Sequence, residues 1–294
     1  MSENSFTTIC TLYSNGMAVF ESIYDYYLHQ LLNCGSYIEQ CKVHAEPELV
    51  HQLRLSIKKL RAFKLLADRL EISGIEEYQQ LIDGVKNMFK LAGQIRDTQV
   101  QIYMLASSKE QTGIGYTLFQ KWLLQREKMK ILQLCGSKYK SSIDSNSGNT
   151  INGIPKTGLP PEKATIISSA QNLLDEMYVK TQILATGSIG NENLHEIRKV
   201  VKQMRYINNI LSGIYPEFHY QRITPEELKD IENAVGNWHD NLIRIEFIER
   251  FMKKIKNRDE VIVLKYKGLA EFSHSSLDEV YENACQVVKS KLLG

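Results

Sequence analysis

Apolar residues recur every three or four positions along most of the chain, a spacing that predicts α-helices with one buried face. Prolines and glycines, 6 and 17 in 294 residues, are few enough for long helices to run without a breaker. The pattern therefore predicts an all-α fold. We expect helices over roughly residues 17–44, 48–71, 75–107, 115–135, 162–186, 192–212, 225–256 and 276–292. Gly93 and Gly236 mark points where the third and seventh helices could be interrupted.

Two of the expected helix starts carry capping signals. Ser73 has Glu76 three residues later, and Thr224 is followed by a proline at a first-turn position and two glutamates. Residues 258–272 are ambiguous, because the apolar run 261–264 fits either a strand or a buried helix.

The strongest boundary signal is a segment at about 141–161, where Ser, Asn, Gly, Thr and three prolines replace the periodic pattern. This segment is interpreted as a linker. It divides a single domain of residues 1–294 into two halves, at about 14–140 and about 162–293. Each half is expected to be a series of helices.

The two halves share two motifs in the same order. His51 and His195 each begin the pattern His-x-x-Arg-x-x-x-Lys-x-x-Arg. Gly93 and Gly236 each begin a segment that ends in Arg-Asp or His-Asp, and they follow the first motif at nearly the same separation. Such a match in order and spacing predicts an internal duplication.

The first motif gives each of its helices one basic and one apolar face. At about 100° per residue, the four motif residues of each copy lie within about 80° of one another. One stripe contains His51, Arg54, Lys58 and Arg61, and the other contains His195, Arg198, Lys202 and Arg205. The residues expected to face the core are Leu53, Ile57, Leu60, Phe63 and Ala67 in the first copy, and Ile197, Val201, Met204 and Leu211 in the second.

The charge pattern of these stripes favours an anionic partner over a solvated helix face. Residues 51–67 contain five Lys or Arg and no Asp or Glu, and only Glu196 lies near the second stripe. Solvated faces usually intersperse acids that pair with cations at i,i+4, whereas cations at that spacing repel one another. Arginine offers a planar fork of donors that matches phosphate oxygens. We therefore expect a groove or channel that is lined by both stripes and binds a polyanionic phosphate.

The histidines and acids of the motifs have structural alternatives. His51 and His195, beside so many cations, are expected to be neutral at pH 7 and could serve as hydrogen-bonding groups of the fold. Asp97 and Asp240 are expected to orient a neighbouring Arg or to cap a local helix end. Metal binding by Asp240 and the histidine before it is disfavoured, since the equivalent pair in the first half is Arg-Asp and arginine cannot ligate a metal.

Composition excludes several other classes of protein. The net charge is +2, so there is no overall attraction to nucleic acid or to a membrane surface. No apolar run is long enough to span a bilayer, and no secretory signal is visible. The five cysteines lack Cys-x-x-Cys spacing and are expected to be reduced thiols of a cytoplasmic protein. There is no glycine-rich phosphate loop, and no cofactor or metal is expected.

The paired motifs, the duplicated His-x-x-Arg-x-x-x-Lys-x-x-Arg helix and the later Gly-x-x-(Arg/His)-Asp segment, resemble the CHAD family, the conserved histidine α-helical domain. The resemblance implies two pseudo-symmetric helical bundles around a basic central cavity that binds inorganic polyphosphate, with association to polyphosphate granules. The ligand contacts it implies are His51, Arg54, Lys58, Lys59, Arg61, Arg96, His195, Arg198, Lys199, Lys202, Arg205 and His239.

Two features depart from the family pattern. Gln99 and Leu242 stand where an acid often follows the motif aspartate, and Gln203 stands where a basic residue is common. The second stripe is therefore thinner than the first. These departures bear on the strength of binding and not on the fold.

The leading hypothesis is a binding protein without catalytic activity, and two other classes compete with it. A phosphohydrolase or phosphotransfer enzyme would use His51 or His195, but no nucleophile, acid pair or metal cluster recurs in both halves. A nucleic-acid-binding protein would need exposed aromatic residues for base stacking. Near the stripes only Phe63 and Tyr206 are aromatic, so nucleic acid is the less favoured ligand.

Overall fold

The computed structural model describes residues 22–72, 76–137 and 162–294, and these residues form an all-α fold with no strand among them. The predicted fold class is therefore confirmed. The helices are α2 (Ile23–Val43), α3 (Pro47–Arg69), α4 (Glu76–Thr112), α5 (Thr117–Cys135), α7 (Lys163–Ala185), α8 (Asn191–Ile214), α9 (Pro225–Ile255) and α10 (Glu260–Leu292). The helix start expected at Ser73 and the whole of the expected linker, about 141–161, lie outside the described residues.

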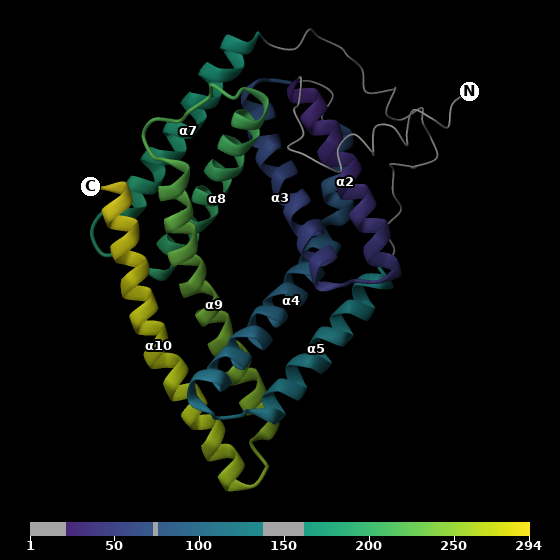
Figure 1. Ribbon diagram of the computed structural model, residues 1–294, viewed down its shortest axis with the longest axis vertical. Coiled ribbons are helices and arrows are strands. Elements are labelled where there is room, and N and C mark those ends of the chain that lie inside the picture. Colours follow the sequence, from purple (N-terminus) through teal and green to yellow (C-terminus); the bar gives the residue numbers. More distant parts are fainter. Residues whose placement is uncertain (1–21, 73–75, 138–161) are drawn as a thin grey trace.

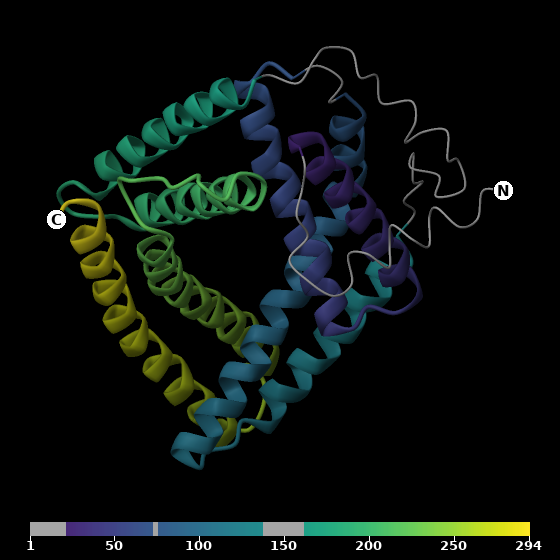
Figure 2. The same cartoon turned by 45° about the horizontal axis from the view of Figure 1, so that its top comes forward.

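The helices fall into two sets in chain order, α2–α5 and α7–α10 (Figure 1). Within the first set α2 packs on α3 and α4 on α5, and within the second α7 packs on α8 and α9 on α10. The sets meet where α3 contacts α7 and α8, and where α9 contacts α4 and α5 (Figure 2). The two helices that carry the His-x-x-Arg motifs, α3 and α8, therefore lie against each other across this boundary. The internal duplication itself stays an inference from the sequence motifs.

The apolar faces of α3 and α8 are buried as predicted. Leu53, Leu60, Ile197, Val201 and Met204 are all fully covered. They belong to one core cluster to which all eight described helices contribute, so both halves share a core. A second cluster lies where α4 and α5 meet α9 and α10, and it is rich in aromatic rings. Burial of the apolar faces leaves the basic stripes on another side of each helix.

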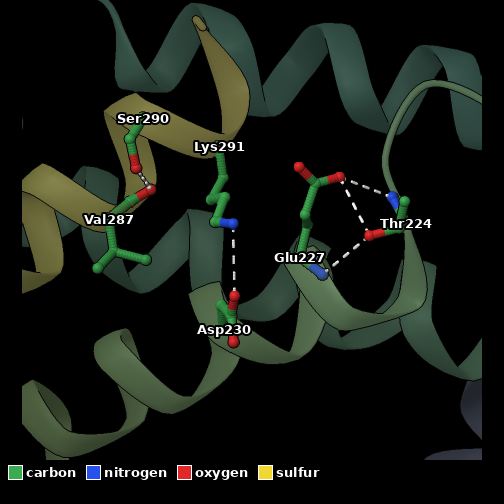
Figure 3. A network of polar contacts seen from close by, with 6 residues as sticks. All are labelled: Thr224, Glu227, Asp230, Val287, Ser290 and Lys291. Atoms are coloured by element: carbon green, nitrogen blue, oxygen red, sulfur yellow. Dashed lines mark hydrogen bonds and ion pairs between the residues drawn. The ribbon is translucent and has the colours of Figure 1, made fainter.

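The start of α9 shows how local sequence sets a helix boundary. The Thr224 hydroxyl accepts a hydrogen bond from Glu227 N at 3.1 Å, and Glu227 Oε2 accepts one from Thr224 N at 2.9 Å. This reciprocal capping box confirms the predicted start (Figure 3). One turn later Asp230 pairs with Lys291 at 3.5 Å, which ties the end of α10 to α9.

Two expectations about secondary structure were wrong. Helices α4 and α9 run through Gly93 and Gly236 without interruption. Residues 260–272 belong to α10, which begins after Asp259, whose side chain accepts a hydrogen bond from Val261 N at 2.9 Å. Within the apolar run Val261 and Leu264 are 74% and 56% exposed, so the run is neither a strand nor a buried helix. The cap at Asp259 and the continuous helical spacing decide the structure here, not the apolar run.

None of the described helices is long and apolar enough to cross a membrane.

Candidate functional site

Four cations from the two basic stripes gather where α3 and α8 meet, and we call them the central cation cluster: Arg54, Lys58, Arg198 and Lys202. All four side chains are half-buried. The pKa of Lys58 is lowered to about 7, chiefly by burial and then by the charge of Lys202. Burial, and next the charge of Arg198, lowers the pKa of Lys202 to about 8. Cations from residues far apart in the chain thus repel one another in one place, as the two-stripe prediction requires.

Two carboxylates of the second motif lie beside this cluster. Burial raises the pKa of Asp97 and of Asp240, while Arg54 opposes the shift at Asp97 and Arg198 opposes it at Asp240. Each aspartate therefore faces the arginine of its own half, which agrees with an orienting role. The helix-capping alternative is wrong, because both residues lie in the interior of α4 and α9. Asp240 also helps to join the halves, since Gln101 Nε2 donates to its backbone oxygen at 2.9 Å.

The motif histidines lie at the edge of the cluster in equivalent surroundings. Burial, and next the charge of Arg96, lowers the pKa of His51. In the second half His239 takes the place of Arg96, and its ring lies 5.2 Å from that of His195. The pKa of His239 is lowered to about 3, chiefly by burial and then by the charge of Arg198. The same two causes lower the pKa of His195. These rings are neutral at pH 7.

The first half holds its arginines against an aromatic ring. The guanidinium carbons of Arg54 and Arg61 lie 5.0 and 4.1 Å from the centre of the Phe89 ring. Arg54 Nη1 also donates to Phe89 O at 3.4 Å. The same guanidinium rests on the backbone at Gly93, where an added Cβ would lie 2.6 Å from Nη1. A glycine is therefore needed at position 93 because Arg54 approaches the helix closely there, and not because the helix breaks.

The second half has a carboxylate at the position equivalent to Phe89, four residues before its own motif glycine. Glu232 lies 2.8 Å from Arg205 Nε and 3.6 Å from Lys202 Nζ, and its side chain is 16% exposed. The contact with Arg205 is an ion pair and not an aligned hydrogen bond, since neither atom has a hydrogen-bond partner. Glu232 therefore neutralises cations of the second stripe, whereas Phe89, at the equivalent position in the first half, adds no negative charge.

Sequence reasoning missed both Phe89 and Glu232. They lie outside the two motifs, and no motif pattern singled them out. Extending the alignment of the two halves to the four residues before the motif glycines would have revealed the exchange of an aromatic residue for an acid.

The structure separates two of the predicted ligand contacts from the cluster. Lys59 lies toward α2, where its charge lowers the pKa of His29. Lys199 is exposed and forms an ion pair with Glu196. Both follow a stripe residue directly in sequence, and a rotation of about 100° per residue moves them off the shared face.

The chemistry available at the cluster is that of an anion-binding site. Sheltered guanidinium and ammonium groups from two helices converge, and their compensation by Asp97, Asp240 and Glu232 is partial. Within the described ranges, no group of three or more His, Cys, Asp or Glu residues is placed to hold a metal ion.

These features define a class: an all-α protein of two helical sets with a buried basic seam between them. The sequence model of the CHAD domain matches residues 36–249, and the chain belongs to the CHAD domain family. The crystal structure of the CHAD domain from the plant Ricinus communis is similar in fold, with a TM-score of 0.64 and 14% sequence identity. The match covers 92% of this chain and 89% of that one. Comparison with curated proteins finds no match.

Proposed function

We propose that the protein binds inorganic polyphosphate at the central cation cluster and has no catalytic activity of its own. The observation that carries this proposal is the convergence of Arg54 and Lys58 with Arg198 and Lys202 across the boundary between the halves. Holding like charges together in a sheltered place is unfavourable unless an anion completes the site. A chain of phosphates supplies many closely spaced charges to groups that lie along two adjacent helices.

Arginine and lysine contribute differently to such a site. The Arg54 guanidinium is held by Phe89 and by the backbone at Gly93, so its fork of donors is already oriented before the ligand arrives. Lys58 and Lys202 are point charges with lowered pKa values, and a nearby anion would raise those values and favour the protonated ammonium form. Charge-assisted hydrogen bonds in sheltered positions stabilise a complex by about 1.5–3 kcal/mol each.

The same geometry gives little support to nucleic acid as the ligand. The two aromatic residues that the sequence places near the stripes, Phe63 and Tyr206, are 1% and 7% exposed and so have no face for a base. The Phe89 ring already contacts the guanidinium groups of Arg54 and Arg61. A site whose donors are guanidinium and ammonium groups favours a ligand that is phosphate throughout. In the cell we expect this activity to place the protein in the cytoplasm, at polyphosphate granules.

The test is a titration of long-chain polyphosphate against the protein and its variants. Arg54→Ala and Arg198→Ala should each weaken binding by roughly 1–3 kcal/mol, because each removes an oriented donor from the cluster. Lys289→Ala, which removes an exposed charge at the far end of α10, is the control and should have little effect. Equal losses for Lys289→Ala and Arg54→Ala would show that binding is spread over the surface, and the proposed site would be wrong.

The absence of catalysis is tested with the same ligand. Polyphosphate incubated with the protein, with and without magnesium, should keep its chain length. Release of phosphate that disappears in the double variant His51→Gln, His195→Gln would instead identify an enzyme.

A further inference from the structure

A second cluster of cations surrounds a pocket between α5 and α9, near the end of the molecule where α5 begins (Figure 1). The pocket has a volume of about 460 Å³ and is lined by Trp122, Gln125, Arg126, Met129, Lys130, Arg250 and Lys254. Four of these seven residues are cations and none is an acid. The volume lies within the range of small-molecule sites.

The wall of this pocket is a rigid aromatic surface. The Trp122 ring stacks on Phe119 at 5.7 Å and meets Phe247 edge-on at 6.0 Å. Arg126 and Lys254 approach the Trp122 ring, each at 6.0 Å from its centre. Phe251 lies 5.9 Å from the same ring, so three aromatic neighbours fix the orientation of the indole before a ligand arrives.

The cations of the pocket are incompletely neutralised. Arg250 pairs with Glu246 at 2.9 Å, but this pair is exposed and therefore weak. Arg126 Nε is buried without a hydrogen-bond partner. Burial, and next the charge of Arg250, lowers the pKa of Arg126. An anion in the pocket would relieve both the repulsion and the unpaired donor.

We propose that this pocket binds a nucleoside triphosphate, with its base against Trp122 and its phosphates among Arg126, Arg250 and Lys254. The ring and the charges together select this class of ligand. Inorganic phosphate would leave the apolar Trp122 and Met129 side chains of the lining unused, and an uncharged aromatic molecule would supply no charge to the four cations. The pocket uses none of the four residues of the central cation cluster, so the proposal stands apart from polyphosphate binding.

The experiment titrates ATP, adenosine and inorganic tripolyphosphate against the double variant Arg54→Ala, Arg198→Ala, in which the central cation cluster is disabled. A fluorescence change that Trp122→Leu abolishes reports binding at this pocket, since the only other tryptophan, Trp238, lies beside His195 with ring centres 4.8 Å apart. ATP should change the fluorescence and bind more tightly than either of the other two ligands. Retained ATP binding in this background would also separate this site from the proposed polyphosphate site.

Variants of the pocket complete the test by calorimetry. Arg250→Gln and Lys254→Gln remove exposed charges and should fold normally, and each should weaken ATP binding about fivefold or more. Trp122→Leu should weaken it about tenfold, because base–aromatic stacking is lost. Lys128→Gln, an exposed cation of α5 outside the pocket, is the matched control. The proposal fails if tripolyphosphate binds as tightly as ATP, if ATP does not bind, or if Arg250→Gln matches Lys128→Gln.

Discussion

At the scale of single residues, Phe89 and Glu232 make the two basic stripes unequal. Phe89 supports the guanidinium groups of Arg54 and Arg61 without removing their charge. Glu232 occupies the equivalent place in the second half and holds Arg205 and Lys202 as ion-pair partners. A phosphate chain that reaches the second stripe must therefore compete with a carboxylate that is already there.

Glu232→Gln should strengthen polyphosphate binding by about 1 kcal/mol, because Lys202 and Arg205 are then free of a competing anion. Glu249→Gln removes an exposed acid of the same helix and serves as the charge control. The measurement is the dissociation constant at fixed salt. Weaker binding in Glu232→Gln would mean that Glu232 positions the cations for the ligand and does not compete with it.

The lysines of the cluster predict how binding depends on pH. In the free protein the pKa of Lys58 is about 7 and that of Lys202 is about 8. A bound polyanion favours the charged ammonium and raises both pKa values, so binding takes up protons. Affinity should be greatest below about pH 7 and should fall as the pH rises from about 7 toward 9.

The titration for this prediction uses long-chain polyphosphate at constant ionic strength. His51→Gln, His195→Gln should keep the loss of affinity above pH 7, since burial places the pKa of both rings below 6.5. Lys58→Gln should reduce this loss of affinity above pH 7. Affinity that is constant from pH 7 to 9 would exclude the lysines as the titrating groups.

At the scale of elements, α4 and α9 are unbroken helices. Each contains the motif glycine of its half and packs on the basic helix of the same half. The two glycines nevertheless do different things. An added Cβ at Gly93 would lie 2.6 Å from Arg54, whereas one at Gly236 would meet nothing within 4 Å. Replacing a helical glycine by alanine stabilises a protein by up to about 1 kcal/mol when the added methyl group meets no close neighbour.

Gly236→Ala should therefore raise the free energy of unfolding by up to about 1 kcal/mol and leave polyphosphate binding unchanged. Gly93→Ala should stabilise less and weaken binding, since the Arg54 guanidinium must move away from the helix. Urea unfolding and polyphosphate titration of the two variants provide the comparison. If both variants bind alike, the contact between Arg54 and Gly93 does not orient the arginine for the ligand.

At the scale of the whole molecule, the net charge of +2 is small, and the proposed binding rests on where the charges lie. Two sets of helices share one core, and the basic faces that the core cannot accept are brought together at the boundary. The electrostatic attraction is therefore local and sheltered, and it depends on both halves being in place.

Polyphosphate affinity should fall linearly with the logarithm of salt concentration, because counterions leave the polymer when the cations replace them. The slope should be steeper than for tripolyphosphate, which offers fewer charges. Arg54→Ala and Arg198→Ala should each reduce the slope by about one. A slope that is the same for both ligands would limit the contact to a few phosphates.

The sequence by itself determined the all-α class, most helix boundaries, the buried faces of α3 and α8, and the family. These properties follow from local spacing: apolar residues at every third or fourth position, a capping box at Thr224, and motifs on one helix face. The structure alone decided that the two stripes meet, that Lys59 and Lys199 turn away, and that Glu232 and Phe89 complete the site. It also formed the pocket between α5 and α9 from residues far apart in the chain. The physical reason is that helical periodicity places a side chain on its own helix, whereas charge neutralisation and ring contacts depend on which other helix packs against it.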